Sequence, residues 1–276
     1  MAGLGRFTAV LGLFRNWNDG VPTSWSVPAM AQALGEPVST LYRTVRELMA
    51  AGFLEQAAEG GYRLGPAFIE FDRILRLSDP LVRNGRPVLS DVVRQAGIPC
   101  VAILARLYNH QVMCVGDEAA PGTGFRSSYE RGRPMPTTRG ATSKVILAHL
   151  PSRELNRLIG GRNEMPELRQ ELVAIRKAGH FVTASEIDPG LAGVAAPVVV
   201  EEQGISASLT LVAEEANLDD SLRRRLVLLV VSAAGLLAED IRSHAVAHAE
   251  PMLSAFNEPP ANSVTNVPGA RKRVPS

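Results

Sequence analysis

Apolar residues in the first part of the chain recur at intervals of three and four positions, which is the period of an amphipathic helix. The pattern Phe7, Val10, Leu11 and Phe14 predicts a first helix from Arg6 to Trp17. A second helix should begin after Ser26, because a serine side chain can accept a hydrogen bond from an unpaired N–H of the first turn. It should end at Gly35, since glycine readily adopts the left-handed conformation that terminates helices.

A third helix, from Ser39 to Ala50, has one apolar and one polar face. Its apolar residues span about a quarter turn and should face a core; they are Leu41, Val45, Leu48 and Met49. Its polar side suits a DNA major groove, where hydroxyls can bind phosphates and arginine can bind guanine. The candidate DNA contacts on this helix are Ser39, Thr40, Tyr42, Arg43 and Arg46. Two helices joined by a short turn in this way predict a helix-turn-helix.

Glu47 lies on the same polar face and complicates that interpretation. A carboxylate there would repel phosphate unless it pairs with Arg43, four residues earlier, or accepts a hydrogen bond from a cytosine amine. Both possibilities stay open from the sequence.

The segment after the third helix alternates in the manner of two short strands. The stretches 53–56 and 62–64, separated by Gly60-Gly61, predict a β-hairpin that would be the wing of a winged helix, with Arg63 as a further candidate DNA contact. Residues 66–77 then predict a helix with Phe68, Phe71, Ile74 and Leu75. Because so many apolar side chains need a partner surface, we expect this helix to bridge two domains and to help dimerisation.

From Pro80 onward the pattern becomes a mixture of helices and strands, so the fold class is α+β. Helices are expected at 81–97, 141–149, 153–159, 165–178 and 218–242. Strands are expected at 99–107, 111–117, 125–129, 181–183, 193–200 and 204–212, with Asn109-His110 as a turn between the first two. The domain bounds that follow are 5–65 for the winged helix-turn-helix, 66–78 for the bridging helix and 79–245 for the second domain. The proline-rich remainder, 246–276, lacks periodicity and is typical of a disordered tail.

Composition places few further limits. The chain has 276 residues, 46% of them hydrophobic and 21% charged, and a net charge of +1. The first 78 residues contain seven arginines and seven acids, although a basic surface is the usual footprint of DNA binding. Specific affinity would therefore have to come from a few placed contacts and from oligomerisation.

The location of the protein in the cell follows from segments that it lacks. No secretion signal is apparent at the N-terminus. The longest apolar run, 226–238, is shorter than the ~20 residues that a membrane span needs. We expect a cytoplasmic protein with no membrane partner. Cys100 and Cys114 should then be reduced and structural, with a thiol sensor as the alternative.

Three motifs carry a family resemblance. The first is the run from Pro37 to Leu48 with Gly61-Tyr-Arg-Leu-Gly-Pro66 after it, and the second runs from Pro136 to Ala148. The third, from Gly179 to Pro197, contains Glu186-Ile-Asp-Pro-Gly190 and ends in Ala-Ala-Pro. In this order and spacing, the motifs resemble those of the IclR-type bacterial transcriptional regulators over about residues 5 to 245.

That resemblance implies a winged helix-turn-helix domain followed by a GAF-like α/β effector-binding domain, assembled as homodimers or dimers of dimers. Such proteins bind double-stranded operator DNA and act as repressors or activators, often of catabolic operons, in response to a small organic molecule. By matching position, the resemblance assigns Ser39, Thr40, Arg43 and Arg63 to DNA contacts.

The resemblance also implies where the effector would bind. The loop 138–142 would form one wall of the pocket, and the sheet would form the other. The candidate effector-binding residues are Thr138, Arg139, Gly140, Ala141, Thr142, Ser143, Thr183, Gly193, Ser208 and Thr210. The family often has histidine at the position of Thr138, glycine at that of Ser143, aspartate at that of Thr183 and cysteine at that of Gly193. Ligands of other members therefore cannot be transferred to this chain.

Arg139 is the candidate with the most specific chemistry. Its guanidinium could clamp an effector carboxylate, and the helix beginning near Gly140 offers free N–H groups to an anion. The alternative is that Arg139, with Arg126, Arg131 and Arg133, lies in a solvent-exposed loop. The remaining candidates are hydroxyl-rich and uncharged, so we expect a small organic acid or amide, aromatic compounds included.

Two other functional classes are weighed against a regulator. A small-molecule enzyme with an appended winged helix would use Arg139, Ser143 or Lys144, but Ser143 and Lys144 point about 100° apart on a helix and no general acid–base group accompanies them. A ligand-blind DNA-binding protein would not need a second α/β domain. His244 and His248 are spaced for a metal but lack a third ligand. We therefore expect no catalytic residue, cofactor or metal.

Overall fold

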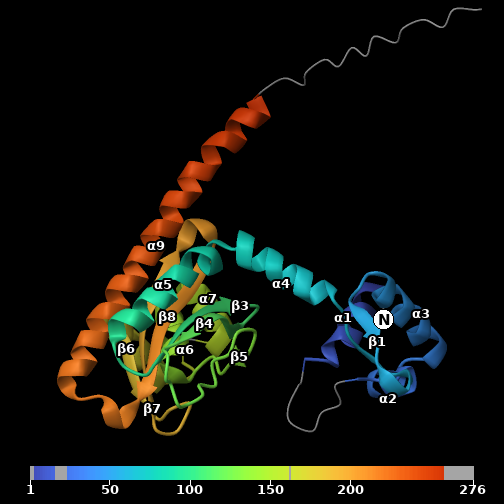
Figure 1. Cartoon of the computed structure of the whole chain (residues 1–276), viewed down its shortest axis with the longest axis horizontal. Helices are drawn as coiled ribbons and strands as arrows, with labels where there is room; N and C mark the ends of the chain where they lie inside the picture. Colours follow the sequence, from blue (N-terminus) through green and yellow to red (C-terminus); the bar gives the residue numbers. More distant parts are fainter. Residues whose placement is uncertain (1–2, 16–23, 162, 258–276) are drawn as a thin grey trace, which may run out of the picture. The chain divides into compact units, whose positions relative to one another are not determined.

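The computed structural model describes residues 3–15, 24–161 and 163–257, with the backbone alone for 245–257. The chain forms two compact units that divide between Arg83 and Asn84 (Figure 1). Each unit has its own buried core, so each is described by itself. The domain bounds expected from the sequence, 5–65, 66–78, 79–245 and 246–276, remain predictions.

The N-terminal unit starts with three helices packed around one core. They are α1 (Gly3–Gly12), α2 (Val27–Leu34) and α3 (Val38–Ala50). The core contains Val10, Met30, Leu41, Val45, Leu48 and Leu54. Helix α1 begins and ends earlier than the expected 6–17, and residues 16 and 17 lie outside the described part of the chain.

The ends of α2 follow the predicted chemistry. The Ser26 hydroxyl accepts a hydrogen bond from the Ala29 N–H at 3.3 Å. Gly35 has φ 64°, and its N–H donates to the Ala31 carbonyl. The left-handed residue turns the chain sharply, so that α3 begins after only a short connection. The predicted helix-turn-helix is confirmed.

The wing is a two-stranded sheet of β1 (Leu54–Gln56) and β2 (Tyr62–Leu64), joined through a 3₁₀ turn at Ala58–Gly60. The turn is centred one residue earlier than Gly60-Gly61, with Glu59 in the left-handed region at φ 58°. Trp25 adds an isolated bridge to Tyr62, with both N–O distances 2.9 Å. This bridge ties the wing to the segment that enters α2.

Helix α4 (Ala67–Ser78) follows the wing. Its first half packs on the base of the wing, where the ring of Phe53 lies 5.6 Å from that of Phe68 and 5.8 Å from that of Phe71. Much of its apolar surface remains exposed, at Phe68, Ile69, Phe71, Ile74, Leu75 and Leu77.

The second unit is a six-stranded antiparallel sheet with helices on both faces (Figure 1). The strand order is β5-β4-β3-β8-β7-β6. The strands are β3 (Val101–Tyr108), β4 (Gln111–Ala119), β5 (Pro134–Met135), β6 (Phe181–Ala184), β7 (Leu191–Val200) and β8 (Ile205–Glu214). The helices are α5 (Pro80–Ala96), α6 (Gly140–His149), α7 (Ser152–Ile159), α8 (Pro166–Ala178) and α9 (Asp220–Asn257).

The alternation of side chains along β3 shows how the two helical layers divide. Ile103 and Ala105 belong to the core shared with Val145 of α6. Leu104 points the other way, toward the region where Gly85 of α5 and Leu237 of α9 meet. Because both faces are covered, the strands are long apolar runs rather than alternating ones, as β7 and β8 show. The turn between β3 and β4 is confirmed, with φ 47° at Asn109 and 68° at His110.

Two expectations about this unit were wrong. Residues 125–129 form no strand, because their polar groups bond elsewhere: the N–H and hydroxyl of Ser128 both donate to the Asp188 carboxylate. The last helix does not end near Arg242 but continues to Asn257, so the first part of the expected disordered tail has a helical backbone. The run Ala245-Val-Ala-His-Ala-Glu250 consists mostly of adequate helix formers, which allows this extension. Residues 258–276 lie outside the described chain.

Candidate DNA-binding surface and effector cavity

The exposed face of α3 carries the predicted DNA contacts. Ser39, Tyr42, Arg43 and Arg46 are exposed, and Thr40 is half-buried. The Arg43 side chain is 84% exposed, so it is free to reach a groove. One residue was assigned to the wrong face: Met49 is exposed, while Thr44 is buried and donates to the Thr40 carbonyl at 3.2 Å. Thr44 can replace an apolar residue because this bond satisfies its hydroxyl.

Each of two candidate arginines holds an acidic partner. Arg43 Nε lies 3.5 Å from Glu47 Oε1 on the same helix, and Arg63 Nε lies 2.7 Å from Glu55 Oε1 across the wing. The first of the two roles left open for Glu47 is therefore confirmed. Exposed ion pairs contribute about 0–1 kcal/mol, so either arginine can exchange its carboxylate for a phosphate or a guanine at little cost.

A small, partly open cavity lies in the second unit, where the start of α6 meets β7, β8 and the loop between β6 and β7. Its lining residues are Tyr129, Ala141, Thr142, Thr183, Glu186, Ile187, Asp188, Leu191, Ala192, Gly193, Thr210 and Val212. Its volume of about 20 Å³ is room for roughly one water molecule. An organic ligand could enter only if the lining moved apart.

Five of the predicted effector residues line this cavity: Ala141, Thr142, Thr183, Gly193 and Thr210. They come from α6 and three strands, and the sheet register brings them together, since Gly193 pairs with both Thr183 and Val212. The hydroxyls of Thr142 and Thr210 are 3.0 Å apart and hydrogen-bonded. A methyl group added at Gly193 would meet the Thr183 hydroxyl at 3.6 Å, which is ordinary contact, so the glycine leaves open space in the cavity.

The other predicted effector residues lie outside the lining. Ser143 Oγ donates to the Pro136 carbonyl at 2.7 Å, and Ser208 Oγ donates to the Thr142 carbonyl at 3.1 Å. Both hydroxyls therefore hold α6 in place rather than face a ligand. Thr138 borders a separate open hollow of about 480 Å³ on the outer side of α6. Gly140 has φ 81° and supports the cavity wall, since a Cβ there would lie 2.8 Å from the Tyr129 hydroxyl.

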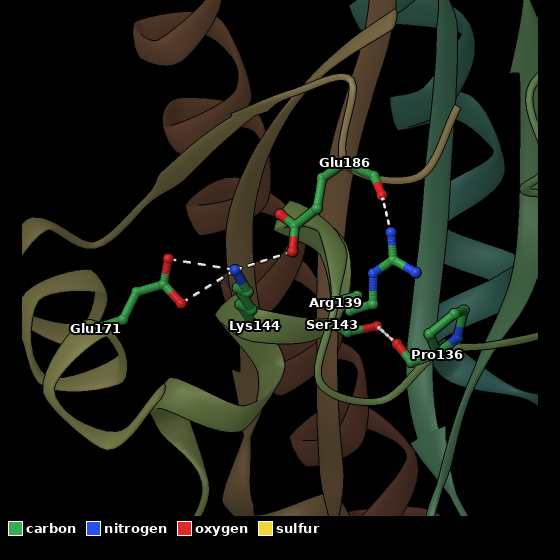
Figure 2. A network of polar contacts seen from close by, with 6 residues as sticks. All are labelled: Pro136, Arg139, Ser143, Lys144, Glu171 and Glu186. Atoms are coloured by element: carbon green, nitrogen blue, oxygen red, sulfur yellow. Dashed lines mark hydrogen bonds and ion pairs between the residues drawn. The ribbon is translucent and has the colours of Figure 1, made fainter. Parts of the chain in front are cut away.

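Arg139 is also outside the lining. Its Nη2 donates to the main-chain carbonyl of Glu186, and its side chain is exposed (Figure 2). The guanidinium thus braces the loop between β6 and β7. The carboxylate clamp expected from the sequence remains a prediction, and it would require Arg139 to leave the Glu186 carbonyl.

Lys144 is the nearest buried cation. Its amine lies 3.0 Å from Glu171 and 2.9 Å from Glu186 (Figure 2). The same amine lies 5.4 Å from the centre of the Phe181 ring. Burial by itself would lower the pKa of Lys144, but the hydrogen bonds and charges of Glu186 and Glu171 outweigh it and raise that pKa. Because Ser143 is bonded to Pro136 instead, the two residues form no catalytic dyad.

The sequence interpretation missed seven lining residues: Tyr129, Glu186, Ile187, Asp188, Leu191, Ala192 and Val212. The first was assigned to a strand that does not exist. The next five belong to the third motif, so the motif itself was the available signal. Asp188 matters most, because its bonds with Ser128 fix the segment that brings Tyr129 into the cavity.

Tyr129 is the least satisfied polar group of the cavity. It is 5% exposed, and its hydroxyl has no hydrogen-bond partner among the described residues. Burial raises the pKa of Tyr129 to about 12, so the phenol stays protonated. The Thr142 hydroxyl is close enough to interact with the phenol, but its well-formed hydrogen bond is with Thr210. A buried phenol whose nearest polar neighbour is already bonded elsewhere favours a ligand that accepts its proton.

Thiols and metal ligands give no further site in the described part of the chain. Cys100 and Cys114 are free and buried, and burial raises their pKa values to about 11 and about 12. They are therefore poor nucleophiles. No cluster of three or more potential metal ligands occurs among the described side chains. His244 contacts Asp240, and the side chain of His248 lies outside the description. Among the described helices, none is both long and apolar enough to span a bilayer.

A winged helix-turn-helix with an exposed arginine face, in one chain with an α/β domain that contains a small cavity lined by several hydroxyls, defines a class of ligand-responsive transcriptional regulators. Comparison with known proteins gives the family. Residues 3–58 match the IclR helix-turn-helix domain, and residues 78–238 match the C-terminal domain of the bacterial transcriptional regulator IclR. The chain belongs to the IclR family of transcriptional regulators.

Relatives and solved structures agree with this assignment. The HTH-type transcriptional regulator KipR of Bacillus subtilis is 26% identical over 205 residues, which cover 70% of this chain and 80% of KipR. An IclR-type regulator from Alicyclobacillus acidocaldarius has a TM-score of 0.71 at 21% identity, covering 87% of this chain and 99% of that one. An IclR homologue from Microbacterium hydrocarbonoxydans, solved with 4-hydroxybenzoate, has a TM-score of 0.70 at 20% identity, covering 88% of this chain and all of that one. The family consists of regulators and not of enzymes, so the enzyme alternative is excluded.

Proposed function

We propose that this chain is a cytoplasmic regulator that binds operator DNA through α3 and the wing, and that its DNA affinity responds to a small organic effector in the cavity. The observation that carries the proposal is the small cavity lined by the hydroxyls of Thr142, Thr183 and Thr210 and by the buried Tyr129 phenol, in the same chain as a recognition helix. From the residues alone, the effector class is a small organic acid or amide, aromatic compounds included. The regulated genes would be a catabolic operon.

The structural neighbour with 4-hydroxybenzoate supports a small organic ligand, because it shares the fold of this chain. The small volume of the cavity suggests how binding could be coupled to a change of shape. A ligand that fits only an enlarged cavity stabilises the enlarged conformation, and so shifts the balance between conformations of the protein. We propose that α4 transmits this shift.

We propose further that the DNA-binding species is a homodimer or a dimer of dimers. The exposed apolar residues of α4 support this, because a monomer would leave the side chains of Ile69, Ile74, Leu75 and Leu77 in water. An oligomer also compensates for the electrically balanced N-terminal unit, since two weak winged helices bound to one operator act with a high effective concentration.

The DNA-binding part is tested with Arg43→Ala in the full-length protein. Loss of a guanidinium that contacts a base should cost about 2 kcal/mol, or roughly thirtyfold in affinity for the operator. The operator is first selected from random sequences with the wild-type protein, and affinity is then measured by fluorescence anisotropy. The matched control is Arg94→Ala, which removes another exposed helical arginine with an acidic neighbour. A loss of less than twofold for Arg43→Ala would show that the recognition helix is misassigned.

The effector part is tested with Gly193→Ala, whose methyl group would occupy the open space of the cavity. A candidate effector that releases wild-type protein from the operator should lose its effect, while DNA affinity without effector stays the same. Gly116→Ala is the matched control, because its methyl group would meet only Leu89, at 3.4 Å. An effector response that survives Gly193→Ala would place the effector elsewhere.

A further inference from the structure

We infer that the cavity selects an uncharged ligand that carries an oxygen acceptor together with hydroxyl or amide donors, and that it rejects carboxylates. This inference rests on the proposed function, since it takes the cavity to be the effector site. It decides between the two ligand classes, acid and amide, that the sequence left open.

The charged groups of the lining all have the same sign. Glu186 and Asp188 contribute carboxylates, and no lysine, arginine or histidine is among the described residues that line the cavity. Asp188 is held by the N–H and the hydroxyl of Ser128, both uncharged donors, so no cation pairs with it there. An anionic ligand would therefore approach two fixed negative charges.

The cations nearest to the cavity are already engaged. The amine of Lys144 is held between Glu171 and Glu186, and its side chain is only 11% exposed. Arg139 is bonded to the Glu186 carbonyl and would have to break that bond to reach a ligand. Neither cation lines the cavity, so the carboxylates of Glu186 and Asp188 are the only charged side chains among its described lining residues.

The start of α6 is the remaining source of positive potential. A helix N-terminus is equivalent to roughly half an elementary charge, which does not balance the two lining carboxylates. Burying a ligand anion without a full counter-charge is strongly unfavourable. A neutral ligand avoids this cost and can still use the free N–H groups of the first turn.

The polar lining matches both ends of a neutral ligand. Tyr129 offers a proton that no described residue accepts, so a carbonyl or hydroxyl oxygen of the ligand can accept it. The carboxylate oxygens of Glu186 and Asp188 can accept N–H or O–H groups in return. A site of this kind discriminates strongly, because a ligand without the matching groups leaves buried polar atoms unpaired.

The test uses matched pairs that differ only in charge: 4-hydroxybenzoate with 4-hydroxybenzamide, benzoate with benzamide, and lactate with lactamide. Binding to the full-length protein is measured by calorimetry at neutral pH, with Gly193→Ala as the occupancy control. We expect the amide of at least one pair to bind at least about tenfold tighter than its carboxylate and to lose affinity in Gly193→Ala. Equal or tighter binding of the carboxylates would overturn the inference. So would the absence of Gly193-sensitive binding by every compound at up to about 10 mM.

Two variants examine the cause of the preference. Glu186→Gln removes one lining charge while Lys144 keeps Glu171, so the preference for the amide should fall by about fivefold. Tyr129→Phe removes the proposed donor and should weaken the amide by about tenfold, with the same melting temperature as the wild type. An unchanged preference in Glu186→Gln, or unchanged amide affinity in Tyr129→Phe, would contradict the mechanism of selection.

Failure of this inference is distinguishable from failure of the proposed function. If 4-hydroxybenzoate releases the protein from its operator, and Gly193→Ala abolishes that release, the cavity is an effector site for an acid. The proposed function would then stand and the inference about charge would fall.

Discussion

The two units of this protein prepare their functional side chains in opposite ways. In the N-terminal unit the candidate DNA contacts are neighbours on one helix and one hairpin, and they point into water. In the second unit the cavity is assembled from residues between 129 and 212, drawn from two loops, a helix and three strands, and it is nearly filled.

The ion pairs of the two units also differ, because those in the N-terminal unit are exposed and those beside the cavity are largely buried. Arg43 and Arg63 hold their acidic partners at the surface, where an ion pair is weak and exchangeable. Lys144 holds Glu171 and Glu186 with little exposure, where loss of one partner leaves uncompensated charge. The arginines of the first unit can therefore exchange their partners for DNA, whereas Lys144 and its two glutamates stabilise the fold around the cavity.

The largest expected effect comes from a close backbone contact in the N-terminal unit. A Cβ at Gly65 would lie 2.3 Å from the Gly52 carbonyl oxygen, so Gly65→Ala should destabilise this unit by about 3 kcal/mol. Both tryptophans of the chain, Trp17 and Trp25, are in this unit, so the transition can be followed by tryptophan fluorescence in urea. Gly193→Ala should leave this transition unchanged. A change below 1 kcal/mol for Gly65→Ala would mean that the backbone yields easily there.

The next effect tests whether the Lys144 network is structural. Lys144→Met leaves Glu171 and Glu186 without their cation and should destabilise the second unit by about 2 kcal/mol, a value reduced because Glu171 is partly exposed. Urea unfolding is followed by far-ultraviolet circular dichroism. Arg94→Met, which breaks an exposed pair with Asp91, should change stability by about 0.5 kcal/mol or less. Similar losses in the two variants would remove the contrast between buried and exposed pairs.

This prediction also has a pH dependence. Because the pKa of Lys144 is raised in the folded chain above its ordinary 10.5, the stabilisation is complete below that value. It should be lost only as the pH rises through the raised pKa. The difference between wild type and Lys144→Met should therefore be constant between pH 7 and 9, and a decrease within that range would contradict the assignment.

A smaller effect concerns the start of α2. Ser26→Ala removes the hydroxyl that accepts the Ala29 N–H and should cost about 1 kcal/mol in the tryptophan-monitored transition. Ser26→Asp should restore most of the loss, since aspartate caps helices equally well. If both variants lose the same stability, the cap is not the reason why the helix begins there.

The smallest effect concerns the acids beside the DNA-contacting arginines. Glu47→Gln frees Arg43 and removes one negative charge from the binding face, so affinity for random DNA should rise by about two- to threefold. Anisotropy titrations at several salt concentrations measure this, with Glu70→Gln on α4 as the control. An unchanged affinity for random DNA would show that Glu47 does not face the nucleic acid.

The structure differs from the sequence predictions for a local reason in the N-terminal unit and for long-range reasons in the second unit. In the N-terminal unit, the cap at Ser26, the turn at Gly35 and the polar face of α3 all depend on residues within a few positions of one another. Met49 was misplaced because Thr44, a polar residue, satisfies its hydroxyl within the helix and takes the buried position. The misassignment of Met49 therefore has a local cause, because the hydrogen bond that lets Thr44 be buried forms within the same helix.

In the second unit, the predicted strands and helices were nearly all found, but only five of the ten predicted effector residues line the cavity. The residues Ser143 and Ser208 are hydroxyls like Thr142 and Thr210, and nothing local tells the two pairs apart. Their different roles depend on whether a main-chain carbonyl from another element lies within reach. Tyr129 was missed because the Ser128–Asp188 bonds, across 60 residues, decide its position.

The sequence by itself determined the two-unit organisation, the recognition helix and the family, because helix periodicity, caps and short motifs are properties of neighbouring residues. The tertiary structure alone decided which side chains enclose the cavity and what charge surrounds it. The exposed or buried state of Arg139, Lys144 and Glu186 depends on packing between elements far apart in the chain, and that packing has no counterpart in local spacing.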